Sequence, residues 1–517
     1  MSKYLMGVDV GTTGAKAMVM TPDGKVVSTG YREYECVYPK QDWVEQDAEL
    51  VVQQTFGACK DAMESGKLNP QDIAGVGFSV QRATFLLIDS DNQVIDGKFY
   101  GWQDNRAASE IPFITSKIPA AELYKLAGMP VTPTFSLEKI VWVQNHEPEK
   151  FARTKKILLT SDYVMWRFGT DEFYCERTNA CCSGMLNVHT LSWSEPILTA
   201  FNISPDKLGR LVDPGTVVGS VSAEAAALTG LMEGTPLVTG TGDQQSAAVG
   251  AGVSEPGSAS LTLGTAGLLV VATAEPVLED ASGFMMVPSS GILGLYELEG
   301  IQLGAASSYR WVRDTIADLE KLEAGRQNKD PYTLMEDHIN KSAPGSNGVV
   351  FLPFLIGAGY PYWNPEAKGA FLGLKFSNTK SDMLRAVMEG VTLESKDMCE
   401  KMKANNVQIN SLAITGGATR SPAWRQIIAD MFDVEVKQLA VGDATIVGVA
   451  ILAGVGVGIF PDVKSGVQRM VGYTDTVRPN AQEVAVYAKS YEVYTAAYQA
   501  FQSSGLFGKL SGLSASR

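Results

Sequence analysis

The sequence predicts an α/β fold made of two related halves, in which mixed sheets are flanked by helices. The same hairpin pattern, an apolar strand, a Gly-Thr turn and a second apolar strand, occurs at residues 7–20 and again at residues 260–273. Strands and amphipathic helices alternate in both halves. The length of 517 residues also exceeds what one hydrophobic core usually supports. We therefore expect two domains, at residues 1–248 and 249–517.

In the first half, the hairpin is followed by an extended run from residue 26 and a helix over residues 50–65. IAGVGFSV at residues 73–80 is almost continuously apolar, which suits a strand covered on both faces. ATFLLIDSDNQVI, which begins at residue 83, predicts another hairpin with an Asp-Asn turn. The alternation continues to a glycine-rich segment at residues 236–252, where the first half ends.

The second half continues from its hairpin into a predicted helix over residues 305–319, a polar stretch over residues 324–332 and another helix. A further helix is expected over residues 380–405. The segment GVAILAGVGVGIF at residues 448–460 is too short to span a bilayer, so it predicts a buried helix. The last predicted helix, residues 481–507, could pack back on the N-terminal domain.

Composition excludes several classes of protein. The net charge of -14 argues against a broad nucleic-acid surface, and the apolar runs are too short for a membrane span. Six cysteines without Cys-x-x-Cys spacing and three histidines indicate neither a disulfide scaffold nor a zinc site. With no signal peptide before the first strand, we expect a cytoplasmic protein. The oligomeric state stays open, with a homodimer as one alternative.

Both Gly-Thr turns have the chemistry of a phosphate-binding loop. Glycine lets the backbone approach an anion closely, and the backbone N–H groups and hydroxyls can donate to it. The residues concerned are Gly11, Thr12 and Thr13 in the first turn, and Gly264 and Thr265 in the second. Two such hairpins facing one another would hold one polyphosphate.

Two aspartates lie at the ends of predicted strands. Asp9 stands among apolar residues just before the first turn, where a carboxylate is costly to bury unless a cation such as Mg²⁺ meets it. A turn-capping role is the alternative for Asp9. Asp243 follows a buried strand in a glycine-rich turn, where it can accept the proton of an alcohol that attacks phosphorus.

Other polar groups complete the predicted site. The glycine turn at Gly417, before a helix capped by Ser421, would admit a flat ring such as adenine. A sugar-sized pocket is indicated where aromatic and polar side chains stand together at strand ends. These side chains are Gln81, Arg82, Trp102 and Asp104.

In this order, the motifs resemble those of the FGGY family of carbohydrate kinases, xylulose kinase-like members included, within the actin-like ATPase superfamily. The resemblance runs along essentially the whole chain and rests on the motifs GVDVGTTGAKA, DWVEQDAE, SVQRAT, YGWQDNRA, GTGDQQSAAVGAG, LTLGTAG, YPYWNPEAKGAFLGL and TGGATRSPAWRQIIADMFDVEV. It implies two actin-like (ribonuclease H-like) domains around a catalytic cleft, and phosphorylation of a sugar or polyol by ATP.

The resemblance also implies roles for individual residues. Asp243 would be the general base and Asp9 would help to hold Mg²⁺-ATP. Phosphates would contact Gly11, Thr12, Thr13, Gly264 and Thr265, and the adenosine would lie by Gly417 and Ser421. The acceptor would face Gln81, Arg82, Trp102, Asp104, Asp243 and Gln244.

Differences within the family bear on the acceptor. Glycerol kinases carry Glu and Tyr where this chain has Ala83 and Thr134, which disfavours glycerol. Xylulose kinases share the Asp104-x-Arg106 pattern, but usually have Met-His in place of Arg82-Ala83. Kinases of the autoinducer-2 precursor have an arginine at the position of Arg82. A ketopentose such as xylulose is the first expectation, and the autoinducer-2 precursor, ribulose, rhamnulose, gluconate and erythritol stay open.

Two other classes compete with a kinase. A nucleotide-dependent binding protein without kinase activity would use the same hairpins, but it would need a peptide-binding module, and none is visible after residue 472. A sugar-sensing repressor would need a basic helix-turn-helix segment, which neither end of the sequence contains.

Overall fold

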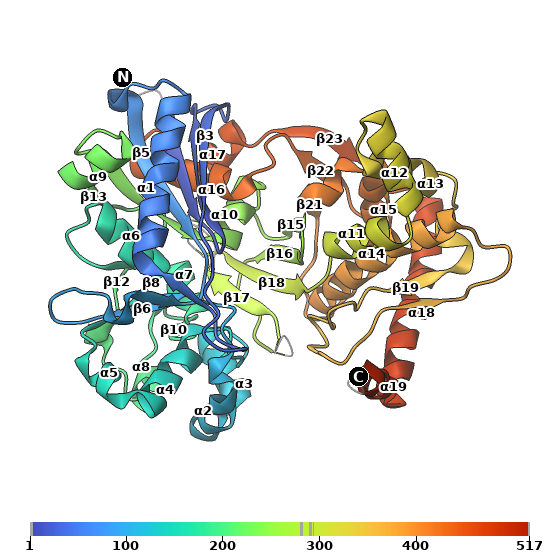
Figure 1. The fold of residues 1–517 in the computed structure, drawn as a ribbon, viewed down its shortest axis with the longest axis horizontal. Helices are drawn as coiled ribbons and strands as arrows, with labels where there is room; N and C mark the ends of the chain where they lie inside the picture. The colour runs from blue at the N-terminus through green and yellow to red at the C-terminus, as the bar shows by residue number, and fades with distance from the viewer. Residues whose placement is uncertain (1–3, 280–282, 289–291, 293, 515–517) are drawn as a thin grey trace. The chain divides into compact units, whose positions relative to one another are not determined.

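The structure is a computed structural model that describes residues 4–279, 283–288, 292 and 294–514 (Figure 1). It contains two compact units that are discontinuous in sequence. The first unit comprises Met1–Pro256, Ala272–Leu298 and Asp443–Gly472, and the second comprises Gly257–Val271, Glu299–Gly442 and Tyr473–Arg517. The division expected at residues 248 and 249 stays a prediction.

A six-stranded mixed sheet lies at the centre of the first unit. Its order is β13-β14-β5-β1-β2-β3, with the bounds Val217–Ser220, Pro236–Gly242, Ile73–Val80, Tyr4–Val10, Gly14–Met20 and Val26–Glu33. Strands β14, β5 and β1 are parallel. Val10 of β1 and Gly242 of β14 both pair with Val80 of β5, so the three strands end at one level of the sheet.

A seven-stranded sheet, most of which lies in the second unit, repeats this arrangement. Its order is β17-β18-β16-β15-β21-β22-β23, with the bounds Met285–Pro288, Tyr296–Gln302, Gly267–Thr273, Ser258–Leu263, Ser411–Thr415, Val436–Leu439 and Tyr473–Val477. Strands β15, β21 and β22 are parallel, and β16 and β23 flank them in the antiparallel direction. The series β23-β22-β21-β15-β16 therefore matches β13-β14-β5-β1-β2, and the predicted duplication is confirmed.

A smaller sheet of the first unit follows β5 directly. Its order is β4-β7-β6-β8, with the bounds Glu45–Asp47, Lys98–Tyr100, Phe85–Ile88 and Lys156–Leu159. The connection at residues 81–84 joins β5 to β6 and thus links the two sheets. Trp102 and Asp104 follow β7, so they lie beside this connection.

Helix α16 (Ala444–Gly456) is the buried apolar helix that the sequence predicts. It packs on β1, β5 and β14 and on helix α10 (Asp243–Gly250). Glycines allow the two helices to touch: a Cβ on Gly448 would lie 1.9 Å from the carbonyl oxygen of Ser246. On the sheet, helix α1 (Ala48–Ser65) packs against β2 and β3.

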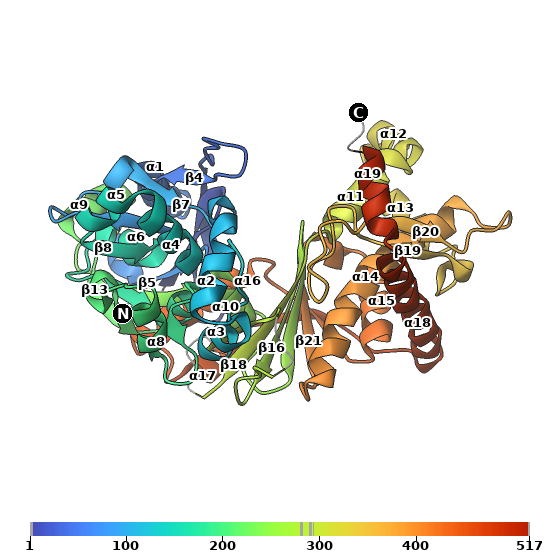
Figure 2. The same ribbon diagram turned by 90° about the horizontal axis from the view of Figure 1, so that it is seen from below.

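In the second unit, helices α14 (Lys380–Ala404), α15 (Pro422–Phe432) and α18 (Ala481–Ser503) pack together, as Figure 2 shows. Helix α18 thus contacts two helices of its own unit, and its packing on the N-terminal domain stays a prediction. The helix expected over residues 305–319 ends earlier, as α11 (Ala306–Thr315). Helix α12 (Asp318–Gln327) extends into the polar stretch at residues 324–332, and α13 (Pro331–Ile339) is the further helix that was expected after it.

Within the described residues, the helices are all too short or too polar to cross a lipid bilayer.

Candidate active site

The strand ends of the first unit bring three carboxylates together. Asp9 is the last residue but one of β1, Asp243 begins α10 directly after β14, and Asp443 precedes α16. Burial, reinforced by the negative charge of Asp243, raises the pKa of Asp9 to about 7. The site is therefore strongly acidic, and a cation bound there would be stabilised.

One oxygen of Asp9 makes this site fit a metal ion. Oδ1 is buried and has no hydrogen-bond donor, which is an expensive state for a carboxylate. Among the residues that the structure describes, no three His, Cys, Asp or Glu side chains form a complete metal-binding group. Mg²⁺ commonly binds through one or two carboxylates together with water and substrate phosphates, and Asp9 suits that mode.

Lys16 supplies a positive charge next to these acids. It stands opposite Asp9 in the pairing of β1 with β2, and its Nζ lies 2.8 Å from Oδ2 of Asp443. Neither Lys16 nor Asp443 was predicted as a site residue. The position of Lys16 could have been predicted from the hairpin register. Residues that pair across a short turn, as Asp9 and Lys16 do, lie on the same face of the sheet.

The first Gly-Thr turn is held in place by side chains around it. Tyr34 Oη donates to the carbonyl oxygen of Gly11 at 2.6 Å, and Gln46 Nε2 donates to that of Thr12 at 2.6 Å. Trp102 Nε1 donates to Oγ1 of Thr12 at 2.9 Å. Thr13 is exposed. The bonds from Tyr34 and Gln46 fix the carbonyl groups of Gly11 and Thr12, and so fix the orientation of the turn's peptide groups.

Arg82 lies against the carboxylate of Asp243. Its Nε is 3.0 Å from Oδ1 of Asp243, and its Nη1 is 3.4 Å from Oε1 of Gln245. The side chain of Asp243 is still 32% exposed, so a substrate can reach it. Gln244 follows directly, and its backbone N–H donates to Oδ1 of Asp243 at 2.8 Å. Of the predicted acceptor residues, the structure thus brings Arg82, Asp243 and Gln244 together.

Gln81 is buried, and its side chain contacts Gln46, one of the residues that hold the first Gly-Thr turn. Its side chain is 2% exposed, and Nε2 donates to Oε1 of Gln46 at 2.7 Å. Gln46 in turn binds the carbonyl of Thr12. A direct contact of Gln81 with an acceptor stays a prediction, while its contact in this structure connects the end of β5 with the Gly-Thr turn.

Asp104 is also buried, with no exposed surface. Oδ1 accepts from Nε of Arg106 at 2.8 Å, and Oδ2 accepts from Nη2 of Arg106 at 2.7 Å and from the backbone of Val44 at 2.7 Å. Arg106 stacks over Trp43, 3.9 Å from the ring centre. A contact of Asp104 with substrate stays a prediction, since both carboxylate oxygens are used within the protein.

The second Gly-Thr turn repeats the features of the first. Gly264 N donates to the carbonyl of Ala266 at 3.0 Å, as Gly11 N does to Gly14 at 3.0 Å. The backbone N–H of Ala305 and Oγ of Ser307 both donate to the carbonyl oxygen of Thr265, at 3.0 and 2.8 Å. The carbonyls of both turns are therefore engaged from outside the hairpin.

Gly417 and Ser421 flank the start of α15. A Cβ on Gly417 would meet no atom within 4 Å, so the backbone there faces open space. Ser421 caps the helix, because its Oγ accepts from the backbone of Trp424 at 3.1 Å, as predicted. Its hydroxyl donates to Glu336 at 2.5 Å, a partner that the sequence did not indicate.

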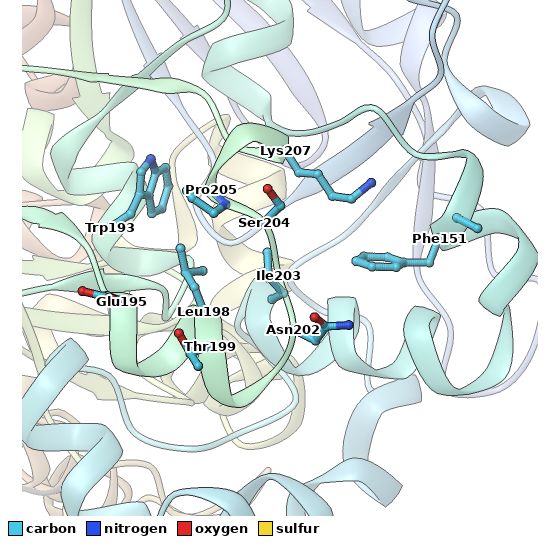
Figure 3. Close-up of a pocket in the computed structure, with 11 residues that line it drawn as sticks. Phe151, Trp193, Glu195, Leu198, Thr199, Asn202, Ile203, Ser204, Pro205 and Lys207 are labelled. Atoms are coloured by element: carbon cyan, nitrogen blue, oxygen red, sulfur yellow. The ribbon is translucent and has the colours of Figure 1, made fainter.

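A surface pocket of about 870 Å³ lies elsewhere in the first unit (Figure 3). Phe151 of helix α5 (Pro148–Arg153) and Leu198 of helix α8 (Glu195–Ala200) line it, together with Trp193 and Lys207. It contains none of the predicted site residues. The site at the strand ends is therefore separate from this pocket.

Known proteins resemble this chain over nearly its whole length. Residues 4–250 and 259–457 match the models of the N-terminal and C-terminal domains of the FGGY family of carbohydrate kinases. The xylulose kinase of Bacillus subtilis (strain 168) is 28% identical over 496 residues, which cover 96% of this chain and 97% of that protein. A gluconokinase of Bacillus licheniformis is 27% identical over 493 residues, covering 95% and 94%.

A solved structure has the same fold. The crystal structure of ligand-bound xylulose kinase from Lactobacillus acidophilus aligns with a TM-score of 0.89 at 25% identity, covering 98% of this chain and 100% of that one. The predicted fold class, two actin-like ATPase domains with mixed sheets flanked by helices, is confirmed.

Proposed function

The chain belongs to the FGGY family of carbohydrate kinases, and from this premise we propose that its acceptor is a ketopentose, xylulose in the first place. As a member of this family, the protein is an ATP-dependent carbohydrate kinase. Two similar proteins are named xylulose kinases, one of them over 96% of this chain. Those names support xylulose as the acceptor to test first.

The observation that carries the mechanism is the position of Asp243 at the strand ends. Its partly exposed carboxylate is oriented by Arg82 at 3.0 Å and by the start of its own helix. In the proposed step, Asp243 accepts the proton of the acceptor hydroxyl. The acceptor oxygen then bonds to the γ-phosphorus of ATP, and the bond from this phosphorus to the bridging oxygen of ADP breaks.

Asp9 and the two Gly-Thr turns complete the proposal. Asp9 would hold Mg²⁺ through its unpartnered Oδ1, and the bound ion would neutralise charge on the phosphates. We assign phosphate contacts to Gly11, Thr12 and Thr13 in the first unit and, separately, to Gly264 and Thr265 in the second. Nucleoside contacts are assigned to Gly417 and Ser421, and acceptor contacts to Gln81, Arg82, Trp102, Asp104 and Gln244.

A sugar acid is the second candidate acceptor. The gluconokinase relative is nearly as similar as the xylulose kinases. Arg82 places a guanidinium beside the general base, and a guanidinium is well suited to meet the carboxylate of gluconate. This alternative predicts a preference for an anionic acceptor over a neutral sugar of similar length.

An acceptor screen tests the proposed substrate. ADP release with Mg-ATP would be measured on xylulose, gluconate, ribulose, rhamnulose, erythritol and the autoinducer-2 precursor. The proposal expects the highest kcat/KM on xylulose, with the phosphorylated product identified by mass spectrometry. A higher value on gluconate would replace xylulose with the second candidate, and ADP release that no acceptor increases would contradict both.

Location and assembly complete the proposal. The six cysteines, all within the residues that the structure describes, form no disulfide, and five of them are buried, which is consistent with the reducing cytoplasm. A homodimer is the assembly to test, by light scattering at the protein concentration of the kinetic assay.

A further inference from the structure

The buried carboxylate of Glu176 and the hydroxyl of Thr178 lie next to the end of β14, just before the proposed base Asp243. Glu176 ends strand β9 (Tyr174–Glu176) and caps the short helix α7 (Arg177–Cys182). Its Oε1 accepts from the backbone of Thr178 at 2.6 Å, and its Oε2 accepts from the hydroxyl of Thr178 at 2.6 Å. Asn179 adds two longer bonds to Oε2, both at 3.3 Å. The carboxylate is thus fully occupied in orienting the first turn of α7.

The same hydroxyl reaches the strand that carries Asp243. The backbone N–H of Gly242, the last residue of β14, donates to Oγ1 of Thr178 at 3.0 Å. Since Thr178 donates its own proton to Glu176, its oxygen is held with a lone pair facing Gly242. Glu176 and Thr178 are 1% and 0% exposed, so no water competes for these bonds.

Gly242 is packed tightly on its other side by Arg82. A Cβ on Gly242 would lie 2.5 Å from Cδ of Arg82, and Nε of the same arginine contacts Asp243. The peptide of Gly242 is therefore fixed between Thr178 and Arg82. A shift of this peptide would therefore move both Arg82 and the carboxylate of Asp243.

We propose that Glu176 and Thr178 form a positioning pair for the general base. Through the Gly242 amide, the pair sets where β14 ends and how the carboxylate of Asp243 faces the acceptor. This inference rests on the proposed function of Asp243. Neither residue touches the substrate, so the pair acts only on the geometry of the phosphoryl-transfer step.

Substitution of Thr178 tests the pair. Thr178→Val keeps the volume and the branching of the side chain but removes the hydroxyl, which leaves the Gly242 N–H unpaired. A displacement of the base by about 1 Å is expected to lower the rate about 10²-fold. We expect kcat for ADP release with xylulose to fall by about that factor, while the KM values for ATP and acceptor stay within about twofold. Thr178→Ser keeps the hydroxyl and should restore most of kcat.

The first unit offers a matched control. Thr229 is equally buried, donates to the carbonyl of Ala225 at 2.7 Å and accepts from the backbone of Leu231 at 3.2 Å. Thr229→Val therefore removes the same kind of hydroxyl at a site that does not contact β14 through it. This variant should lose stability without the selective fall in kcat.

The outcomes separate this inference from the proposed function. An active wild type with an unchanged kcat in Thr178→Val, or an equal loss in Thr229→Val, would overturn the positioning pair and leave the kinase proposal standing. An inactive wild type on every acceptor would overturn the proposed function and this inference with it. If Thr178→Val does not fold, Thr178→Ala serves instead, because it removes the same hydroxyl with a smaller side chain. The same selective loss of kcat is then expected, and its absence would refute the pair.

Discussion

At the scale of single residues, Asp9 and Asp243 differ in the hydrogen-bond donors around their carboxylates. Asp9 keeps one oxygen without a donor, in the place where the proposed mechanism needs a cation. Asp243 is instead oriented by two donors on Oδ1, from Arg82 and from the backbone of Gln244. The two aspartates thus differ in environment as their proposed roles differ. Asp9 is therefore suited to its proposed role in holding a metal ion, and Asp243 to its proposed role as the base.

Glu394, in helix α14 of the second unit, gives a prediction about pH. Burial raises its pKa from 4.5 to about 8. The unfolded chain therefore releases this proton at lower pH than the folded protein does. Between about pH 4.5 and pH 8, the free energy of unfolding should fall with rising pH, by at most about 1.4 kcal/mol per pH unit from this group.

Glu394→Gln isolates the effect of this carboxyl, because glutamine does not titrate. Urea unfolding of both proteins at pH 5.5 and pH 7.5 should show the wild type losing stability relative to the variant as the pH rises. The same difference at both pH values would mean that Glu394 does not carry this dependence.

Part of the site could be predicted from residue patterns alone. Asp9 was found as a carboxylate among the apolar residues of a strand, and Asp243 because it follows a buried strand. The ends of such parallel strands meet at one edge of a sheet. Gln81 and Asp104 also follow strands, but their side chains turn inward to Gln46 and Arg106. Which way a polar side chain faces after a strand depends on partners distant in sequence, and sequence alone does not give these. For the same reason Asp443 was missed.

At the scale of elements, the contact of α10 with α16 fixes the start of the helix that carries Asp243. The two helices approach so closely that there is no room for a side chain at Gly250. A Cβ there would lie 1.8 Å from the carbonyl oxygen of Ala444. The hydroxyl of Thr445 also donates to the carbonyl of Asp243 at 3.4 Å. The glycines of this pair are thus required by packing.

Gly448→Ala should consequently destabilise the protein, since its new Cβ would overlap the carbonyl of Ser246, 1.9 Å away. Overpacking of this kind costs about 1–3 kcal/mol, occasionally more, and it should be visible as a lower urea midpoint. Gly325→Ala is the control, because a Cβ there meets no atom within 4 Å in helix α12. Equal stability of Gly448→Ala and wild type would show that the helices can separate without loss.

Elements with strong local patterns were predicted well. Strand β5 has the predicted bounds, Ile73–Val80, and α16 is the expected buried helix. Helix α12 was not predicted as a separate helix because the segment DLEKLEAGRQ is mostly polar, although its Glu, Lys and Arg residues are good helix formers. A polar helix on the surface has little hydrophobic periodicity to reveal it.

At the scale of the whole molecule, the repeated hairpin proved to be part of a repeated sheet. The matching series of five strands in each unit could be anticipated in outline from the two Gly-Thr turns, because each turn opens the same order of elements. The sequence did not show, however, that each unit is built from three separate segments of the chain. Residues 443–472 belong to the first unit although they follow most of the second in sequence, and such long-range packing leaves no local pattern.

If Asp243 is the base of this carbohydrate kinase, Asp243→Asn should lose most of its turnover. Loss of a general base typically lowers turnover by about 10²–10⁴-fold. We would measure the kcat of ADP release with Mg-ATP and the best acceptor, for wild type, Asp243→Asn and the control Asp213→Asn, whose exposed carboxylate pairs with Arg177. We expect a loss of about 100-fold or more in Asp243→Asn alone, with acceptor binding retained in calorimetry. A turnover close to that of wild type would show that Asp243 is not the base.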